Sequence, residues 1–216
     1  MICSAPAGAQ TVAITNGIVA TGDGSEPVRG ATVVIRDGRV VAAGAGVRIP
    51  SGAQVIDATG KWVTPGIVAG FSRLGLTEVD LSAEGSDDTS ANGSPFSAAI
   101  DVAPSVNPLS STIAVNRADG ITRALVAPAA GKNIFAGQGA VIDTGSDMNA
   151  ITRPRLFQFV ELGETGADKA GGSRSSAHVL FRNALREAAE LRRFVTPLSG
   201  RRGDPGRGFR SHRPFR

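Results

Sequence analysis

Few residues in this sequence combine the type and the spacing that catalysis or metal binding requires. Histidine, the commonest metal ligand, occurs only twice, as His178 and His212. His178 lies within one turn of the start of an expected helix, on or beside its apolar face, where a partly buried structural histidine is favoured over a ligand. His212 lies in a glycine- and arginine-rich tail, and the one cysteine, Cys3, excludes an internal disulfide. No catalytic residue and no metal ligand is therefore predicted.

Two other groups of residues could bind ions. Glu84, Asp87 and Asp88 lie in a polar stretch, 82–97, and carboxylate oxygens are ligands for hard cations. Their spacing does not match an EF-hand loop, so a solvated loop is favoured. The glycine-rich stretch "GKNIFAGQG" holds Lys132 and could cradle an anion through backbone amides. It lacks the Gly-x4-Gly-Lys-Ser/Thr spacing of a phosphate loop, so a phosphate site is not favoured.

The composition is that of an ordinary globular protein. The chain has 216 residues, of which 41% are apolar, and its mean hydropathy is +0.02. No run approaches the roughly 18 apolar residues of a membrane span, so we expect a soluble chain. The 28 glycines and 12 prolines indicate many turns between short strands. The length is below the about 250 residues that a complete (β/α)8 barrel usually needs.

The positive charge is concentrated at one end. The net charge is +4, but residues 199–216 hold six arginines and one aspartate, so the rest of the chain has a net charge of −1. Such a tail could neutralise phosphates, yet it has no folded platform, and nucleic acid is not the expected partner. The abrupt change to Gly, Pro and Arg suggests the hypothesis of a disordered, frameshifted tail. Translation of the other two reading frames downstream would test it, and no family-like continuation there would refute it.

The opening segment, 1–10, resembles the end of a secretory signal. Ala7-Gly8-Ala9 has the small-x-small spacing of a cleavage site, but a charged region and most of the apolar region are missing. We therefore expect either a signal remnant, with a periplasmic or secreted protein, or a disordered terminus on a cytoplasmic one.

The first sixty residues read as short strands separated by glycine turns. Asn16-Gly17 and Asp37-Gly38 are turn pairs that supply the positive φ angles of tight hairpins. The pattern predicts an antiparallel meander over 11–62, half of a small sandwich. Its other expected parts are strands at 31–36, 39–43 and 54–57 and a turn at Thr59-Gly60.

The following residues mix strands with helices. Residues 120–128 have the continuous apolar character of a buried parallel strand, a weak helix is expected within 107–119, and another strand covers 140–143. The clearest helix lies within 175–194, with Ser175 or Ser176 as its cap and Pro197 as its end. Its apolar residues recur at helical spacing and form one face: Ala177, Leu180, Phe181, Ala184, Leu185, Ala188 and Leu191.

The meander "NGIVATGDGSEPVRGATVVIRDGRVVAAG", followed by "VIDATGKWVTPG", resembles the amidohydrolase superfamily, in particular its imidazolonepropionase-like branch. The likeness covers about residues 11–70, and more loosely "GITRALVAP" and "FAGQGAVID". It implies a β-sandwich built from both chain ends beside a (β/α)8 barrel whose first strand begins at a Pro-Gly. Complete relatives hydrolyse C–N bonds, often in cyclic amides, with water activated by a divalent metal such as zinc.

The family's metal motif, Pro-Gly-x-x-Asp-x-His-x-His, is altered here. Pro65 and Gly66 match, but Ala69 stands at the Asp, Phe71 at the first His and Arg73 at the second. Phenylalanine has no lone pair to donate, and a guanidinium stays protonated and repels a cation. We therefore expect no metal cofactor in this chain. The absent later strands would supply the family's remaining ligands.

The predicted fold is mixed β and α/β, a partial N-terminal β-sandwich followed by the first units of an incomplete (β/α)8 TIM barrel. The predicted domains are a sandwich at 11–64 and the start of a metal-dependent hydrolase barrel at 65–198, between the terminal segments 1–10 and 199–216. An open sheet edge and an uncovered apolar face favour self-association or aggregation.

The predicted protein is a truncated amidohydrolase, inactive alone, and whether it is an enzyme stays open. One alternative is a non-catalytic protein that binds a small ligand in a metal-free pocket, with Phe71, Arg73 and Lys132 as binding residues. A weaker alternative, a nucleic-acid binder, depends on the basic tail.

Overall fold

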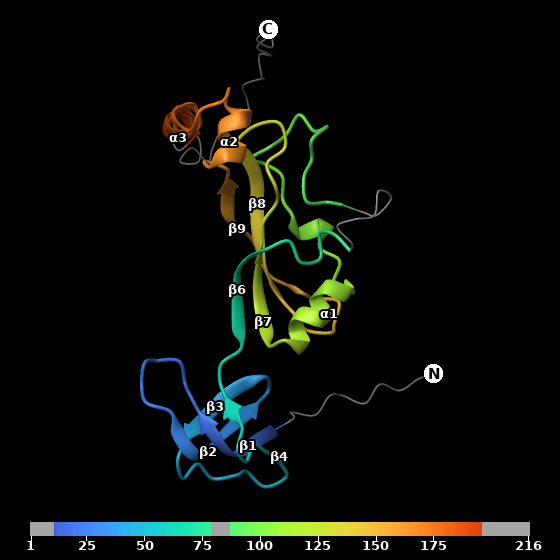
Figure 1. Ribbon diagram of the computed structural model, residues 1–216, viewed down its shortest axis with the longest axis vertical. Coiled ribbons are helices and arrows are strands. Elements are labelled where there is room, and N and C mark those ends of the chain that lie inside the picture. The colour runs from blue at the N-terminus through green and yellow to red at the C-terminus, as the bar shows by residue number, and fades with distance from the viewer. Residues whose placement is uncertain (1–10, 79–86, 196–216) are drawn as a thin grey trace, which may run out of the picture. The chain divides into compact units, whose positions relative to one another are not determined.

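The computed structural model describes residues 11–78 and 87–195, and it divides into two compact units after Ile67 (Figure 1). Each unit has a sheet and a hydrophobic core of its own. The predictions for the signal remnant, for Glu84, for Pro197 and for the basic tail lie outside the described residues.

The first unit is a single mixed sheet. Its strand order is β3-β2-β1-β4, and β5 also pairs with β1. The hairpin at Asp37-Gly38 is confirmed: both residues have positive φ angles, 52° and 71°, and the strands on either side pair antiparallel. The strands are β1 Thr11–Val19, β2 Val28–Arg36, β3 Arg39–Gly44, β4 Gln54–Asp57 and β5 Trp62–Val63.

The hairpin predicted at Asn16-Gly17 is wrong. Asn16 does adopt a positive φ of 61°, but β1 continues through it, and β1 pairs with β2 on both sides of a register shift. The pair therefore forms a bulge. Gly17 is needed there because a Cβ atom would lie 2.7 Å from Cγ2 of Val63. Asn16 Nδ2 also donates to Asp57 Oδ1 at 3.0 Å, which ties the bulge to the end of β4.

The predicted antiparallel meander is also wrong for its last two strands. β4 and β5 run parallel to β1, because the chain after β3 crosses to the free side of β1. The core of this unit is small, with Val19, Ala31 and Val33 buried together. Val40, Trp62 and other large apolar side chains of this unit remain exposed.

A carboxylate organises the connection between β1 and β2. Asp23 Oδ1 accepts hydrogen bonds from the hydroxyl of Ser25 at 2.6 Å, from its amide at 2.9 Å and from the hydroxyl of Thr21 at 2.7 Å. These bonds stabilise the charged form, the Ser25 hydroxyl most, and lower the pKa of Asp23 from 3.8 to about 2.

We therefore expect the Asp23 carboxyl carbon to titrate near pH 2 in an NMR experiment. Because the folded pKa is lowered, this carboxylate contributes stability above pH 4 or so, and the contribution is lost as the pH falls toward 2. Ser25→Ala should move the midpoint toward 3.8. A midpoint already near 3.8 in the unmodified chain would contradict the assignment.

The second unit is built on a four-stranded sheet of order β6-β7-β8-β9. The strand expected within 120–128 is confirmed as β7, which lies between β6 and β8; it pairs antiparallel with β8, and β8 pairs antiparallel with β9. A parallel arrangement needs a crossover helix, and the connection from β7 to β8 contains none. The strands are β6 Ile67–Ser72, β7 Ile121–Val126, β8 Phe135–Asp143 and β9 Ile151–Val160.

The described residues thus form a mixed β and α fold, and the barrel units expected from 65 onward stay a prediction. No strand is predicted at β9, whose sequence contains Pro154. The strand accommodates this proline in a bulge, where Arg155 has a positive φ of 49°. Arg155 also lies 3.8 Å from the carboxylate of Asp101.

The sheet of the second unit packs against α1, Ser111–Ala118, which confirms the weak helix expected in this region. Ile113 of α1 joins Val126 and Ile142 of the strands in one buried cluster. A short 3₁₀ helix, Ala103–Ser105, precedes α1. Figure 1 shows α1 beside β7, and α2 and α3 at the other end of the strands.

The predicted long helix is confirmed as α3, Arg174–Val195, and follows the short helix α2, Glu164–Lys169. The predicted cap is wrong. Ser173 Oγ accepts from the amide of Ser175 at 3.2 Å, whereas Ser176 donates its hydroxyl to the carbonyl of Ala170 at 2.6 Å.

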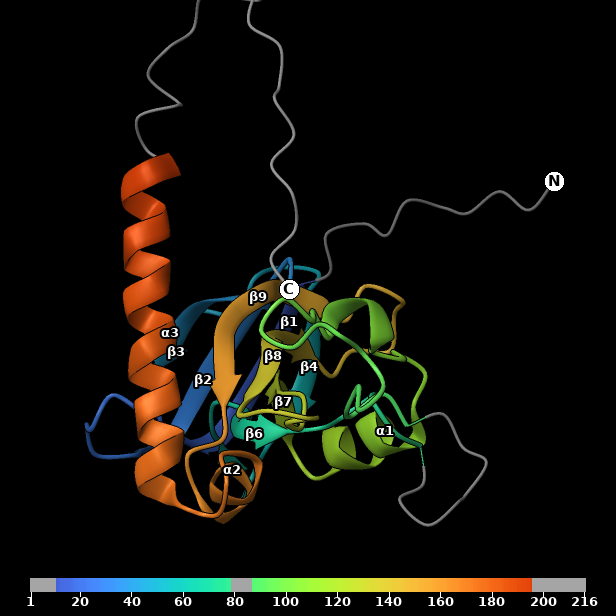
Figure 2. The same ribbon diagram turned by 90° about the horizontal axis from the view of Figure 1, so that it is seen from above.

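The predicted apolar face of α3 is only partly covered. Figure 2 shows the first turns of α3 beside α2 and the rest of the helix running past it. Ala177 is fully buried, and Phe181 lies 6.4 Å from Phe135 between ring centroids. Further along, Leu185 and Leu191 are exposed. Periodicity therefore located the helix correctly, but only its first part packs within the described residues.

Candidate ligand site beside strand β6

The three residues at the family's motif positions lie along one face of β6 and its continuation. Ala69, Phe71 and Arg73 are each two residues apart, and in an extended chain such residues point to the same side. All three line one open pocket of about 470 Å³. The rest of the lining comes from the end of β6, from the segment after it, from α1 and from the start of β7: Ser72, Leu74, Thr77, Glu78, Thr112, Asn116 and Ile121.

The pocket lining includes an aromatic ring, Phe71, and a cation, Arg73, which contact each other. The Phe71 ring lies 5.3 Å from the Phe159 ring between centroids, at an interplanar angle of 41°. The guanidinium carbon of Arg73 lies 5.9 Å from the Phe71 centroid, within the range of a cation–π contact. Phe71 is nevertheless 56% exposed, so much of its ring remains accessible to a ligand.

The side chains of Ala69, Phe71 and Arg73 do not suit a metal ion. Ala69 and Phe71 offer no lone pair, and the Arg73 guanidinium carries a fixed positive charge. Within residues 11–78 and 87–195, no group of three or more His, Cys, Asp or Glu side chains gathers in a metal-binding cluster. No hydrolytic step through a metal can therefore be derived from these residues.

Glu78 adds a negative charge to the lining of the pocket, and hydrogen bonds hold its carboxylate in place. Glu78 Oε1 accepts from Nδ2 of Asn107 at 2.7 Å, and Oε2 accepts from the backbone amide of Ser111 at 3.4 Å. Ser111 is the first residue of α1, and an anion at a helix N-terminus is stabilised by the unpaired amides there. Asn116 Nδ2 donates to the Thr112 carbonyl at 2.8 Å, which leaves its side-chain oxygen as an acceptor.

Asp87 is the described part of the acidic group considered as a cation site. Its Oδ1 accepts from the amide of Thr89 at 2.9 Å. Hydrogen bonds from the side chain and the amide of Thr89, with a smaller contribution from the Arg73 charge, lower the pKa of Asp87. The amide of the neighbouring Asp88 donates to the carbonyl of Leu76 at 2.9 Å. These contacts organise the chain next to the pocket.

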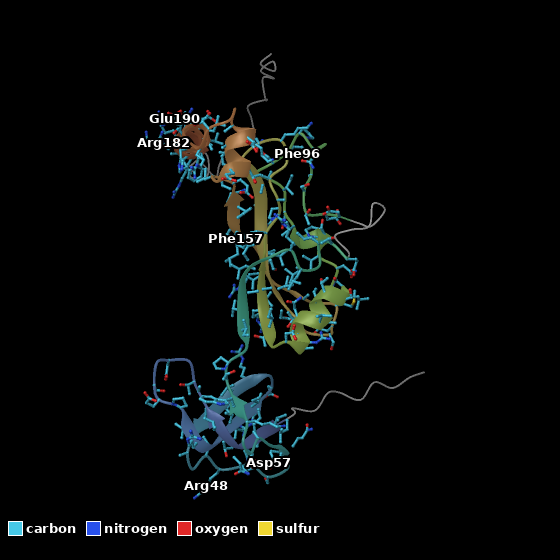
Figure 3. The ribbon with its side chains drawn as sticks, in the orientation of Figure 1. Arg48, Asp57, Phe96, Phe157, Arg182 and Glu190 are labelled. Atoms are coloured by element: carbon cyan, nitrogen blue, oxygen red, sulfur yellow. The ribbon has the colours of Figure 1, made fainter. Side chains whose placement is uncertain are left out.

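Lys132 does not join Phe71 and Arg73. It lines a separate pocket of about 160 Å³ with Phe96 and Phe135. Phe96, labelled in Figure 3, is 67% exposed. The structure thus brings together two of the three predicted binding residues.

His178 is exposed on the first turn of α3, so the expectation of a partly buried structural histidine is wrong. The first turn of α3 buries Ala177 and leaves His178 toward solvent.

None of the described helices is long and apolar enough to cross a membrane.

Sequence reasoning missed Glu78, Asn116 and Phe159 as site residues. Glu78 comes a few positions after β6, and its carboxylate could have been considered as a site residue from the sequence. Asn116 comes from α1 and Phe159 from β9, and only the packing of these elements brings them to β6.

Comparison with known proteins shows to which family the chain belongs. No family model matches the chain. A dihydroorotase from Anaeromyxobacter dehalogenans (strain 2CP-C) is 32% identical over 173 residues, which is 78% of this chain and 36% of that protein. A dihydroorotase from Anaeromyxobacter sp. (strain K) is 31% identical over the same length. The chain belongs to the amidohydrolase superfamily.

The fold of this amidohydrolase-superfamily chain also has a solved counterpart. The crystal structure of an amidohydrolase from Thermotoga maritima MSB8 matches with a TM-score of 0.76 at 21% identity, over 94% of this chain and 52% of that one. The chain thus spans about a third of the length of the curated relatives it matches and about half of this structure. The assignment to the imidazolonepropionase-like branch stays a prediction.

Proposed function

We propose that this amidohydrolase-superfamily chain binds a small anionic ligand with a planar apolar part, and that it does not hydrolyse amides by the family's metal route. One observation carries the proposal: Phe71 and Arg73, which stand at the family's histidine positions, line the same open pocket. The exposed Phe71 ring offers a face for stacking, and the Arg73 guanidinium offers paired N–H donors for a carboxylate.

The relatives named dihydroorotase suggest the alternative of C–N bond hydrolysis. The residues at β6 favour binding over hydrolysis, because neither Phe71 nor Arg73 can hold the metal that would activate water. We also propose, as the family implies, that the later strands of a complete barrel carry the remaining metal ligands. Zinc analysis of the purified chain, with an assay of a cyclic amide such as dihydroorotate, tests it. Stoichiometric zinc together with turnover would contradict it.

Arg73→Gln is the sharpest test of binding. With 3-phenylpropanoate as the probe, calorimetric titration should give an affinity about 10- to 100-fold lower than that of the unmodified chain, since a hydrogen bond to a charged group contributes about 1.5–3 kcal/mol. Arg182→Gln is the matched control, because Arg182 is an exposed arginine on α3 (Figure 3). Equal losses in both variants, or no binding by the unmodified chain, would refute the proposal.

Self-association through an open sheet edge also stays a proposal. The exposed apolar side chains of the first unit, Val40, Val41, Val55 and Trp62 among them, support it. Sedimentation velocity would test it, and a monodisperse monomer across a range of concentrations would count against it.

A further inference from the structure

The pocket beside β6 contains charges of both signs. Arg73 and Glu78 both line it, and they come from a short stretch of chain that turns between them. They form no salt bridge with each other; within the described residues Arg73 makes no salt bridge, although its charge contributes to the lowered pKa of the Asp87 carboxylate. Two opposite charges that line one pocket without pairing leave both sites available to a ligand.

The Glu78 carboxylate is fixed in place and still has capacity to accept. It accepts from the Asn107 side-chain amide and from the Ser111 backbone N–H, whereas a carboxylate offers about four acceptor positions. The side-chain oxygen of Asn116, on the neighbouring turn of α1, adds an acceptor to the same lining. Such acceptors suit an ammonium group, which carries three donors and no acceptor.

A ligand with only a carboxylate would satisfy Arg73 but would place a second negative charge near Glu78. Like charges inside a partly desolvated pocket repel one another, and the repulsion is removed if the ligand also carries a positive group. The exposed Phe71 ring, backed by Phe159, gives the third contact, an aromatic or apolar face.

We infer that the ligand of this pocket is a small zwitterion of the amino-acid type, with its carboxylate on Arg73, its ammonium on Glu78 and an aromatic or planar side chain on Phe71. The inference rests on the proposed binding function and narrows it to a ligand class. It does not involve Lys132, which lines a different pocket.

A matched series of three probes tests the inference on the unmodified chain. L-Phenylalanine carries both charges, 3-phenylpropanoate lacks only the ammonium, and 2-phenylethylamine lacks only the carboxylate. Calorimetric titration should rank L-phenylalanine at least about tenfold tighter than either of the others, because each missing charge removes one charge-assisted contact.

Glu78→Gln supplies the second arm. Glutamine keeps the size and an acceptor oxygen but removes the charge, so the preference for L-phenylalanine over 3-phenylpropanoate should fall to within about threefold. Equal binding of the two probes by the unmodified chain would overturn the zwitterion assignment and leave the anionic-ligand proposal standing. If none of the probes binds, both proposals are overturned. Circular dichroism checks that the variant folds, and the ranking on the unmodified chain does not depend on the variant.

Discussion

Replacing Phe71 and Arg73 together by histidine should create a divalent-metal site in a chain that has none at this position. The two side chains lie two residues apart, face the same pocket and would present two imidazoles to one ion. Four-ligand structural zinc sites contribute about 10–16 kcal/mol, so two ligands should contribute roughly half, which corresponds to a Kd between about 1 µM and 0.2 mM. Titration with Co²⁺, followed by visible absorption, measures it.

The control for this experiment is Phe71→His alone, which offers one imidazole beside the Arg73 cation. It should bind Co²⁺ far more weakly than the double variant, because one ligand is lost and the positive charge remains. Equal affinity of the single and double variants would show that the two side chains do not converge. Tight stoichiometric binding by the unmodified chain would show that other residues supply a site.

Ile142→Ala should destabilise the second unit by about 2–5 kcal/mol, the usual result of truncating a large, fully buried aliphatic side chain. Ile142 has no exposed surface and packs in the cluster that joins β7, β8 and α1. The first unit has a separate core around Val33, so its stability should not change. Amide hydrogen exchange, read strand by strand, measures the two units independently.

Leu156→Ala on β9 is the matched control for this prediction. It removes a side chain of the same size that is 56% exposed, and its effect should stay within about 1 kcal/mol. A loss of protection in β1 and β2 equal to that in β7 and β8 would mean that the two units unfold as one. Unchanged protection in the second unit would contradict the assignment of its core.

The fold could be predicted from local patterns wherever a local rule was sufficient. Asp37-Gly38 made a hairpin because both residues take positive φ angles and the strands on either side pair directly. Asn16-Gly17 has the same chemistry and made a bulge, because β2 pairs with β1 both before and after it. Which outcome a turn pair takes depends on the partner strand, and the local sequence does not contain that information.

Strand direction was a second limit. The apolar run of β7 correctly indicated a strand, but such a run does not give the direction of each neighbouring strand. The connection from β7 to β8 contains no helix, and β8 therefore returns antiparallel. Similarly, the periodicity of α3 predicted its apolar face but could not tell that only the part near Ala177 and Phe181 has a partner.

The likeness to the family and the replacement of its metal ligands can both be recognised in the sequence. The meander and the Pro65-Gly66 motif carry the likeness, and Ala69, Phe71 and Arg73 cannot bind a metal in any fold, because that property belongs to the side chains themselves. The packing of the second unit, in contrast, had to be known to see that Phe71 and Arg73 share a pocket with Glu78 while Lys132 lines another. A pocket is made by elements distant in sequence, here β6 and α1, and the way these elements pack determines which charges meet.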